Sequence, residues 1–123
     1  MQRVLGTLIS FVLSVVVWAG ETISEGWLAK GTKWETPFYV RVSGQDGPTV
    51  VITGGIHGNE PAGARAAEQI RHWSITRGRL VVIPQANIPG LRDGTRFLPG
   101  EPPSRRDLNR QFPKTKMAAE AHG

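Results

Sequence analysis

The feature that most constrains the fold is a pair of short apolar runs on either side of an alanine-rich segment. The first run, Thr49–Thr53 (TVVIT), is β-branched throughout, which is typical of a strand buried on both faces. The second run, residues 79–84 (RLVVIP), is mostly apolar and predicts a second buried strand. Residues 62–73 (AGARAAEQIRHW), between the two runs, favour a helix. This order of strand, helix and strand predicts a parallel βαβ unit. We therefore expect an α/β fold with a mixed, mainly parallel sheet flanked by helices.

The predicted helix has a clear start. Asn59 is a favourable N-cap residue, and Pro61 falls in the first turn, where its missing N–H costs little. Glu60 falls in the same turn, where the helix dipole favours a carboxylate.

The remaining segments contribute fewer predicted elements. A short strand is expected near residues 27–30, and residues 37–43 (PFYVRVS) alternate as a strand does. Residues 44–48 (GQDGP) predict a turn. Residues 85–113 are rich in proline, and we expect them to be irregular. A long irregular stretch in a compact domain is often functional.

The N-terminal segment has the pattern of a secretory signal. Arg3 provides a positive charge, an uncharged apolar run covers residues 4–17, and Ala19 precedes the expected cleavage point. The run is shorter than the ~20 residues of a membrane-spanning helix. We expect residues 1–19 to be a cleaved signal peptide, with an exported domain over residues 20–123 and no stable membrane span after cleavage. The alternatives are an uncleaved anchor and a buried valine-rich first strand.

Charge and cysteine content narrow the functional classes. The net charge is +5, and residues 65–123 alone contribute 11 basic and 5 acidic side chains. Such a region attracts an anion, such as nucleic acid, a lipid headgroup or a carboxylate, unless it is simply a solvated surface. No aromatic stacking platform is interleaved with the arginines, which argues against nucleic acid. There is no cysteine, so a metal site must use His, Asp or Glu.

The segment 53-TGGIHGNEPAG-63 is the strongest candidate site. It places His57 and Glu60 beyond the carboxyl end of a predicted strand, where α/β sheets bind ligands. Imidazole and carboxylate are standard zinc ligands, and a catalytic zinc commonly has three protein ligands and an open position. His57 and Glu60 would supply two of them. The alternative is a surface turn with a hydrogen-bonded His–Glu pair, and a phosphate site is disfavoured because the turn lacks Gly-Lys-Ser/Thr.

Two motifs in order, GGIHGNEPAG and the downstream RDLNRQFP, resemble the succinylglutamate desuccinylase/aspartoacylase family of zinc carboxypeptidase-like hydrolases. The likeness covers roughly residues 45–113. It implies that His57 and Glu60 are zinc ligands and that Asn109 and Arg110 bind substrate. It further implies a substrate-binding arginine before an aromatic residue, for which Arg96 is the best match, while Arg105 and Arg106 stay open as alternatives.

The arginine roles agree with the chemistry. A guanidinium group binds a carboxylate through two parallel hydrogen bonds and keeps its charge at every relevant pH. Near zinc, it also stabilises a developing oxyanion. The alternative for Asn109 and Arg110 is a capping Asn beside a solvated Arg.

The resemblance also implies a third ligand, a histidine on a later strand, and a glutamate general base, and neither is evident. His72 and His122 are poor candidates for the ligand, and Glu101 and Glu120 do not match the base. Residues 20–123 therefore resemble the N-terminal part of a zinc hydrolase catalytic domain. The expected function is cleavage of the amide bond of a small N-acyl amino acid or peptide that carries a carboxylate. A non-catalytic remnant that binds such a ligand is the alternative, and a basic nucleic-acid or membrane-surface binder is a third.

Overall fold

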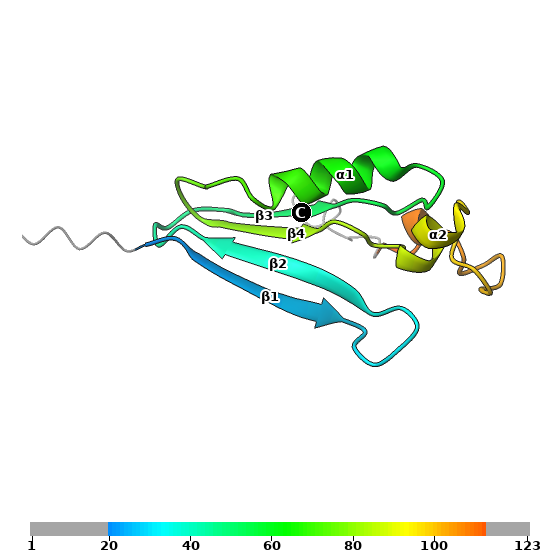
Figure 1. Ribbon diagram of the computed structural model, residues 1–123. Coiled ribbons are helices and arrows are strands. Elements are labelled where there is room, and N and C mark those ends of the chain that lie inside the picture. The colour runs from blue at the N-terminus through cyan, green and yellow to red at the C-terminus, as the bar shows by residue number, and fades with distance from the viewer. Residues whose placement is uncertain (1–19, 113–123) are drawn as a thin grey trace, which may run out of the picture.

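The computed structural model describes residues 20–112 (Figure 1). The expected signal peptide, residues 1–19, lies outside the described residues, as do Glu120 and His122. Within residues 20–112, none of the helices is long and apolar enough to cross a membrane.

The described strands form one mixed sheet. Along the chain they are β1 (Thr22–Leu28), β2 (Thr36–Val42), β3 (Thr49–Thr53) and β4 (Arg79–Ile83), and their order in the sheet is β1-β2-β4-β3. β3 and β4 pair in parallel, whereas β1 with β2 and β2 with β4 pair antiparallel. The predicted mixed α/β sheet and its parallel βαβ unit are therefore confirmed, and only the β3–β4 pair is parallel among the described strands.

One helix, α1 (Pro61–Ile70), lies over β3 and β4 on one face of this sheet (Figure 1). Its Ala67 packs with Leu80 and Val82 of β4, and these three buried side chains form the core. Ile52 and Ile70 pack against them. Alanine at the contact lets the helix lie close to the strands, so the apolar face of α1 is narrow but well covered.

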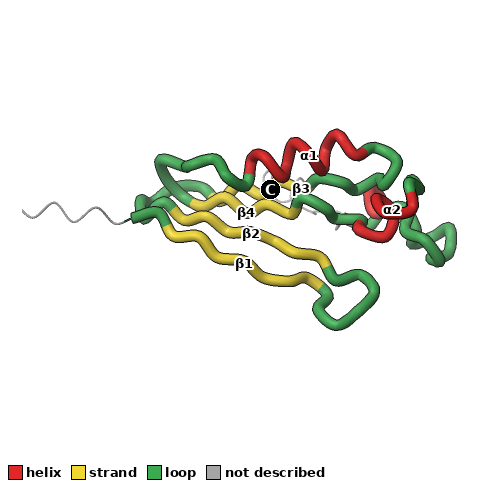
Figure 2. Tube along the Cα trace, in the orientation of Figure 1, coloured by secondary structure: helices red, strands yellow, loops and turns green. Residues whose placement is uncertain are grey.

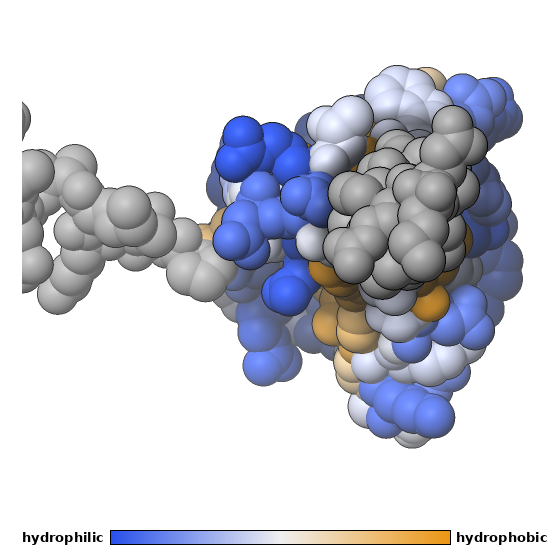
Figure 3. Space-filling model, turned by 90° about the vertical axis from the view of Figure 1, so that its left-hand side faces the viewer, coloured by the Kyte–Doolittle hydropathy of each residue, from blue (hydrophilic) through white to orange (hydrophobic). Residues whose placement is uncertain are grey.

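The expectation that Thr49–Thr53 is buried on both faces is wrong. β3 is an edge strand of the described sheet, and its residues Val50 and Val51 are 48% and 59% exposed. A β-branched run of this kind is equally compatible with an edge strand, because the pattern reports local propensity and not the position in the sheet. Figure 3, an end-on view, shows apolar side chains toward the middle of this end of the molecule, with hydrophilic side chains on both sides of them.

The helix boundaries also differ from the sequence predictions. Glu60, not Asn59, is the N-cap residue of α1, because the Glu60 amide is already hydrogen-bonded to the His57 carbonyl in a preceding turn. The helix ends at Ile70 and not at Trp73, where i to i−3 hydrogen bonds tighten the chain into a turn.

The segment after β4 is more ordered than expected. It contains α2 (Ile88–Asp93) and a short 3-10 helix, η1 (Leu108–Arg110). Pro89 lies in the first turn of α2, where proline is tolerated, and Asn87 caps the helix. β1 is likewise longer than the strand expected near residues 27–30. Figure 2 shows that the loops following β3 and β4 lie at the same end of the sheet, beside α2.

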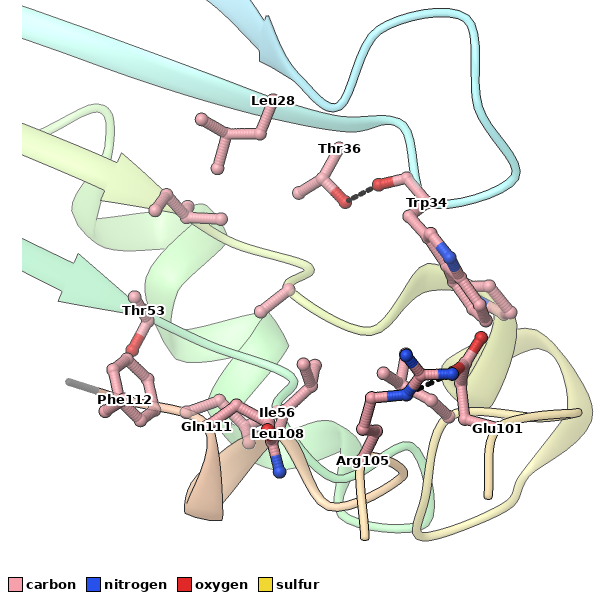
Figure 4. Close-up of a pocket in the computed structure, with 14 residues that line it drawn as sticks. Leu28, Trp34, Thr36, Thr53, Ile56, Glu101, Arg105, Leu108, Gln111 and Phe112 are labelled. Atoms are coloured by element: carbon pink, nitrogen blue, oxygen red, sulfur yellow. Dashed lines mark hydrogen bonds and ion pairs between the residues drawn. The ribbon is translucent and has the colours of Figure 1, made fainter. Parts of the chain in front are cut away.

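A cavity of about 710 Å³ opens at this end of the sheet. Its wall is largely apolar and includes Leu28, Ile56 and Leu108, with Arg105 and Glu101 on one side (Figure 4). Glu101 forms ion pairs with Lys33 (3.6 Å) and Arg105 (3.7 Å), so its carboxylate already has two cationic partners.

Candidate functional site

The ligand loop, residues 54–60, connects the carboxyl end of β3 to the first turn of α1. Its glycines are required by close packing. Gly55 adopts a positive φ of 63°, and a Cβ on Gly58 would overlap the carbonyl groups of Gly90 and Thr95. These contacts hold the loop against α2 and the segment that follows it, so His57 and Glu60 are carried on a fixed backbone.

The two predicted ligands face each other. Nδ1 of His57 lies 3.5 Å from Oε2 of Glu60, and the His57 side chain is only 10% exposed whereas that of Glu60 is 58% exposed. The three-residue spacing across the turn therefore brings one ring nitrogen and one carboxylate oxygen to a common point. A cation placed there would be open to solvent on the Glu60 side.

A residue that the sequence interpretation left out, Asp107, fixes the histidine ring. Its Oδ1 lies 3.1 Å from Nε2 of His57 and also accepts a hydrogen bond from the backbone N–H of Asn109 at 3.1 Å. A carboxylate at Nε2 favours the tautomer in which Nε2 carries the proton and Nδ1 offers a lone pair. The available signal was the first letter of the DLNR motif, whose last two residues alone were singled out.

Glu60 is held on its other side by an arginine. Oε1 of Glu60 accepts a hydrogen bond from Nη1 of Arg96, the arginine favoured by the Arg-Phe pair. That bond is the largest influence on the pKa of the Glu60 carboxyl, which lies below its ordinary value of 4.5. Glu60 is therefore ionised at neutral pH, as a metal ligand or an arginine partner must be.

The pKa of Asp107 is also lowered, from an ordinary value of 3.8. Burial is the largest single influence and raises it. The hydrogen bonds from His57 and from the Asn109 amide, together with the charge of Arg110, outweigh that burial. An ionised Asp107 is the form that accepts a hydrogen bond from the ring, so the charge state supports the orientation of His57.

The structure brings most of the predicted site residues together. His57, Glu60 and Asn109 line one shallow depression of about 480 Å³ at the carboxyl end of β3, and Arg96 joins them through Glu60. Arg110 does not line this depression. Its Nη1 donates to the Asn109 carbonyl at 3.3 Å, and its side chain is exposed.

The alternative arginines and histidine lie elsewhere. The guanidinium of Arg106 stacks on Phe97 at 4.6 Å, and Arg105 pairs with Glu101 beside the larger cavity. His72 follows the carboxyl end of α1, the end opposite the ligand loop, and its Nε2 lies 3.7 Å from Oε1 of Glu68. Of the four arginines considered for substrate binding (Arg96, Arg105, Arg106 and Arg110), Arg96 is the one that contacts a predicted metal ligand, Glu60.

The donor set fits a zinc ion in part. His57 Nδ1 and Glu60 Oε2 are suitable donors, and Asp107 occupies the other ring nitrogen, so it does not converge with them. Among residues 20–112, no three His, Cys, Asp or Glu side chains are grouped closely enough to hold a metal ion. The described residues therefore provide two ligands for a metal and one carboxylate that orients the histidine ligand.

Comparison with known proteins identifies a family. The succinylglutamate desuccinylase/aspartoacylase catalytic domain matches residues 46–122, more than half of the chain. N-alpha-acetyl-L-2,4-diaminobutyric acid deacetylase from Halomonas elongata is 34% identical over 71 residues, which is 55% of this chain and 20% of that protein.

Solved structures give the same result. An aspartoacylase family protein from Mesorhizobium loti is 28% identical, with a TM-score of 0.60 over 78% of this chain and 31% of its own. A product-bound ectoine utilization protein EutE (DoeB) from Ruegeria pomeroyi is also 28% identical, with a TM-score of 0.60 over 82% of this chain and 33% of its own. The chain thus spans about a third of the length of these structures, and it belongs to the succinylglutamate desuccinylase/aspartoacylase family.

Proposed function

We propose that this chain contributes part of the active site of a zinc-dependent hydrolase that cleaves the amide bond of a small N-acyl amino acid or peptide. The observation that carries the proposal is the orientation of His57, whose Nε2 faces Asp107 while its Nδ1 faces Glu60. A surface turn with a simple His–Glu pair does not need the second carboxylate. The family membership supports deacylase chemistry, and the name of the Halomonas elongata relative describes a deacetylase.

In this proposal, His57 and Glu60 would hold the zinc ion, which when bound activates water and polarises a carbonyl group. Asp107 keeps the proton on Nε2 of His57, so that Nδ1 is free to coordinate. Arg96 and Asn109, beside the depression, bind the substrate carboxylate and the developing negative charge, and Arg110 assists them. In this proposal the described residues 20–112 supply two of the metal ligands.

The proposal is tested first by metal binding. We expect the 123-residue chain to bind Zn²⁺ weakly, and His57→Ala and Glu60→Ala to weaken the affinity by at least about tenfold each. His72→Ala is the matched control, because His72 is an exposed histidine at the opposite end of α1. Zinc binding that is unchanged in His57→Ala would contradict the proposed site.

Activity is tested on a longer gene product, where sequencing beyond codon 123 reveals one. We expect such a product to hydrolyse N-acyl amino acids and to lose this activity when a chelator is added. A longer product that is fully active in the presence of chelator would overturn zinc dependence while leaving the family assignment intact.

A non-catalytic role is the second candidate, favoured by the presence of only two convergent donors among the described residues. In that role the chain binds a carboxylate-bearing ligand through Arg96 and Arg110. Binding of an N-acyl amino acid that survives both a chelator and His57→Ala, but is lost in Arg96→Ala, would favour it over the hydrolase.

We also propose that the protein is exported and that residues 1–19 are removed. The support is the sequence alone, with its positive charge at Arg3 and apolar run over residues 4–17. N-terminal sequencing of the protein from its native host is expected to begin at Gly20, and an intact Met1 on the purified protein would contradict cleavage.

A further inference from the structure

Asn87 is the most completely buried polar side chain of the described chain, with an exposed fraction of 0%. It lies between β4 and α2, and the sequence motifs did not single it out. The hydrogen bonds that the structure records for Asn87 all go to two segments, the ligand loop and α2. A buried amide is costly unless its donors and acceptor are paired, so these bonds define what the residue holds together.

One set of bonds goes to the ligand loop. The Asn87 backbone N–H donates to the Gly55 carbonyl at 3.0 Å, and its side-chain Nδ2 donates to the Ile56 carbonyl at 3.3 Å. Ile56 directly precedes His57, so the side-chain amide holds the peptide that carries the first proposed ligand.

The other set goes to α2. Oδ1 of Asn87 accepts the Gly90 N–H at 2.9 Å, which caps the helix, and the Gly90 carbonyl accepts the Thr95 N–H at 3.0 Å. The next residue, Arg96, uses its carbonyl to accept the Gly58 N–H at 3.4 Å. Asn87 thereby connects the loop that carries His57 and Glu60 to the segment that carries Arg96.

We propose that Asn87 is a positioning residue, whose side-chain amide sets the ligand loop relative to α2 and so places His57 against Asp107 and Glu60. The inference rests on the proposed function, since a metal would be held by the loop that Asn87 fixes. The competing role is helix capping alone. The two roles use different atoms, because capping needs only Oδ1 whereas loop positioning needs Nδ2.

Asn87→Ser separates these roles. Serine is as good an N-cap as asparagine, so its hydroxyl can accept the Gly90 N–H, but it cannot reach the Ile56 carbonyl as the amide does. Ser43→Ala is the matched control. Ser43 is also a buried polar residue with hydrogen bonds to backbone carbonyls, but it lies at the opposite end of the sheet, beside Gly78.

Two measurements are made on the full chain. The first records the ring nitrogen chemical shifts of His57 by NMR, without metal and at mildly alkaline pH. We expect a single tautomer, protonated at Nε2, in the wild type and in Ser43→Ala, and a mixture of tautomers in Asn87→Ser. The second measures affinity for Zn²⁺ alone, and we expect Asn87→Ser to weaken it by roughly tenfold, with no change in Ser43→Ala.

The outcomes are distinguishable. A wild-type tautomer and wild-type zinc affinity in Asn87→Ser would overturn the positioning role. If the wild-type chain binds no zinc, the proposed function fails, but the tautomer measurement still decides whether Asn87 positions His57. If Asn87→Ser does not fold, Asn87→Asp is measured instead, since it retains the capping oxygen and places a second oxygen, not a donor, against the Ile56 carbonyl. A single Nε2-protonated tautomer in folded Asn87→Asp would likewise refute the inference.

Discussion

Two polar clusters lie at opposite ends of the sheet, and they have similar ingredients but different surroundings. At one end, Nη1 of Arg41 lies 2.5 Å from Oε2 of Glu21. At the other end, His57 lies between Glu60 and Asp107. The Arg41 and His57 side chains are each 10% exposed, so burial of the central group does not distinguish the two clusters.

The exposure of the carboxylate distinguishes them, since the Glu21 side chain is 24% exposed. Both oxygens of Glu21 are occupied by the chain itself, since Oε1 accepts the Ile75 N–H at 3.0 Å and Oε2 binds Arg41. Glu60 instead is 58% exposed and borders an open depression. The Glu21–Arg41 pair, which we call the closed cluster, ties segments together, although Nε of Arg41 is buried there without a hydrogen-bond partner. The group of His57, Glu60 and Asp107, which we call the open cluster, has an accessible carboxylate that can take up a ligand.

The largest expected effect concerns the loop that keeps the second cluster open. Gly58→Ala would force a Cβ into the carbonyl groups of Gly90 and Thr95, which are backbone and cannot swing aside. We expect the variant to lose zinc binding and to show a greater fall in melting temperature than Arg41→Ala or Asp107→Asn. Thermal unfolding and zinc titration check both parts.

Gly63→Ala is the matched control for that change. Gly63 lies in α1, and a Cβ there would come no closer than 3.8 Å to the nearest atom, the Gly55 nitrogen. Alanine in a helix interior is favoured over glycine by about 0.5–1 kcal/mol, so this variant is expected to be more stable. A Gly58→Ala protein that is as stable as Gly63→Ala would show that the ligand loop is not tightly packed.

Arg41→Ala tests the closed cluster and is expected to be the next largest change. It leaves Glu21 without its cationic partner and removes the donor to the Arg71 carbonyl (3.3 Å) at the end of α1. We expect a fall in melting temperature on the order of 10 °C, because breaking a buried pair from one side is costly. Zinc affinity should not change, and a matching loss of zinc affinity would mean that the two ends of the sheet are coupled.

Much of the fold was accessible from the sequence because local patterns determine it. The runs TVVIT and RLVVIP and the alanine-rich segment between them specify a βαβ unit through period and composition, and β3 was placed with its observed bounds. The edge position of β3 was not accessible, since strand order depends on contacts between distant segments. α2 was missed because the prolines near it were interpreted as helix breakers, although Pro89 is in the first turn.

The sequence predicted those parts of the site whose residues lie close together along the chain. His57 and Glu60 are three residues apart, so their approach follows from one turn, whereas Asp107 lies 50 residues beyond His57. Asn87 was missed for a similar reason, because its partner Ile56 is 31 residues away. The motif resemblance supplied Arg96 and Asn109, which no local pattern would have connected to His57.

Asp107→Asn is expected to affect the open cluster without unfolding the chain. An amide at this position can donate to Nε2 of His57 through its NH₂ group, which would favour the tautomer protonated at Nδ1 and so block that nitrogen for a metal. We expect zinc affinity to fall roughly 10- to 100-fold with little change in melting temperature. Asp93→Asn is the control, because Asp93 is a more exposed carboxylate paired with its neighbour Arg92 (2.8 Å). Equal zinc affinity in both variants would refute the orienting role of Asp107.

The smallest expected effect is a pH dependence that belongs to the closed cluster. The hydrogen bond from the Ile75 amide, followed by the contacts with Arg41, holds the pKa of Glu21 below its ordinary value of 4.5, despite opposing burial. The unfolded chain therefore takes up the proton first. The contribution of Glu21 to stability is fully present above pH 4.5 and is lost as the pH falls through the lowered pKa.

Urea unfolding of the wild type and of Glu21→Gln, followed from neutral pH down to about pH 3, isolates this contribution. The difference in unfolding free energy between the two proteins should be constant near neutrality and should shrink as the pH falls below 4.5. Glu60, which also has a lowered pKa, titrates in both proteins and so cancels in the difference. A gap that stays constant to low pH would mean that Glu21 gains nothing from its charge in the folded state. The closed cluster would then be held by the other contacts of Arg41, such as its hydrogen bond to the Arg71 carbonyl.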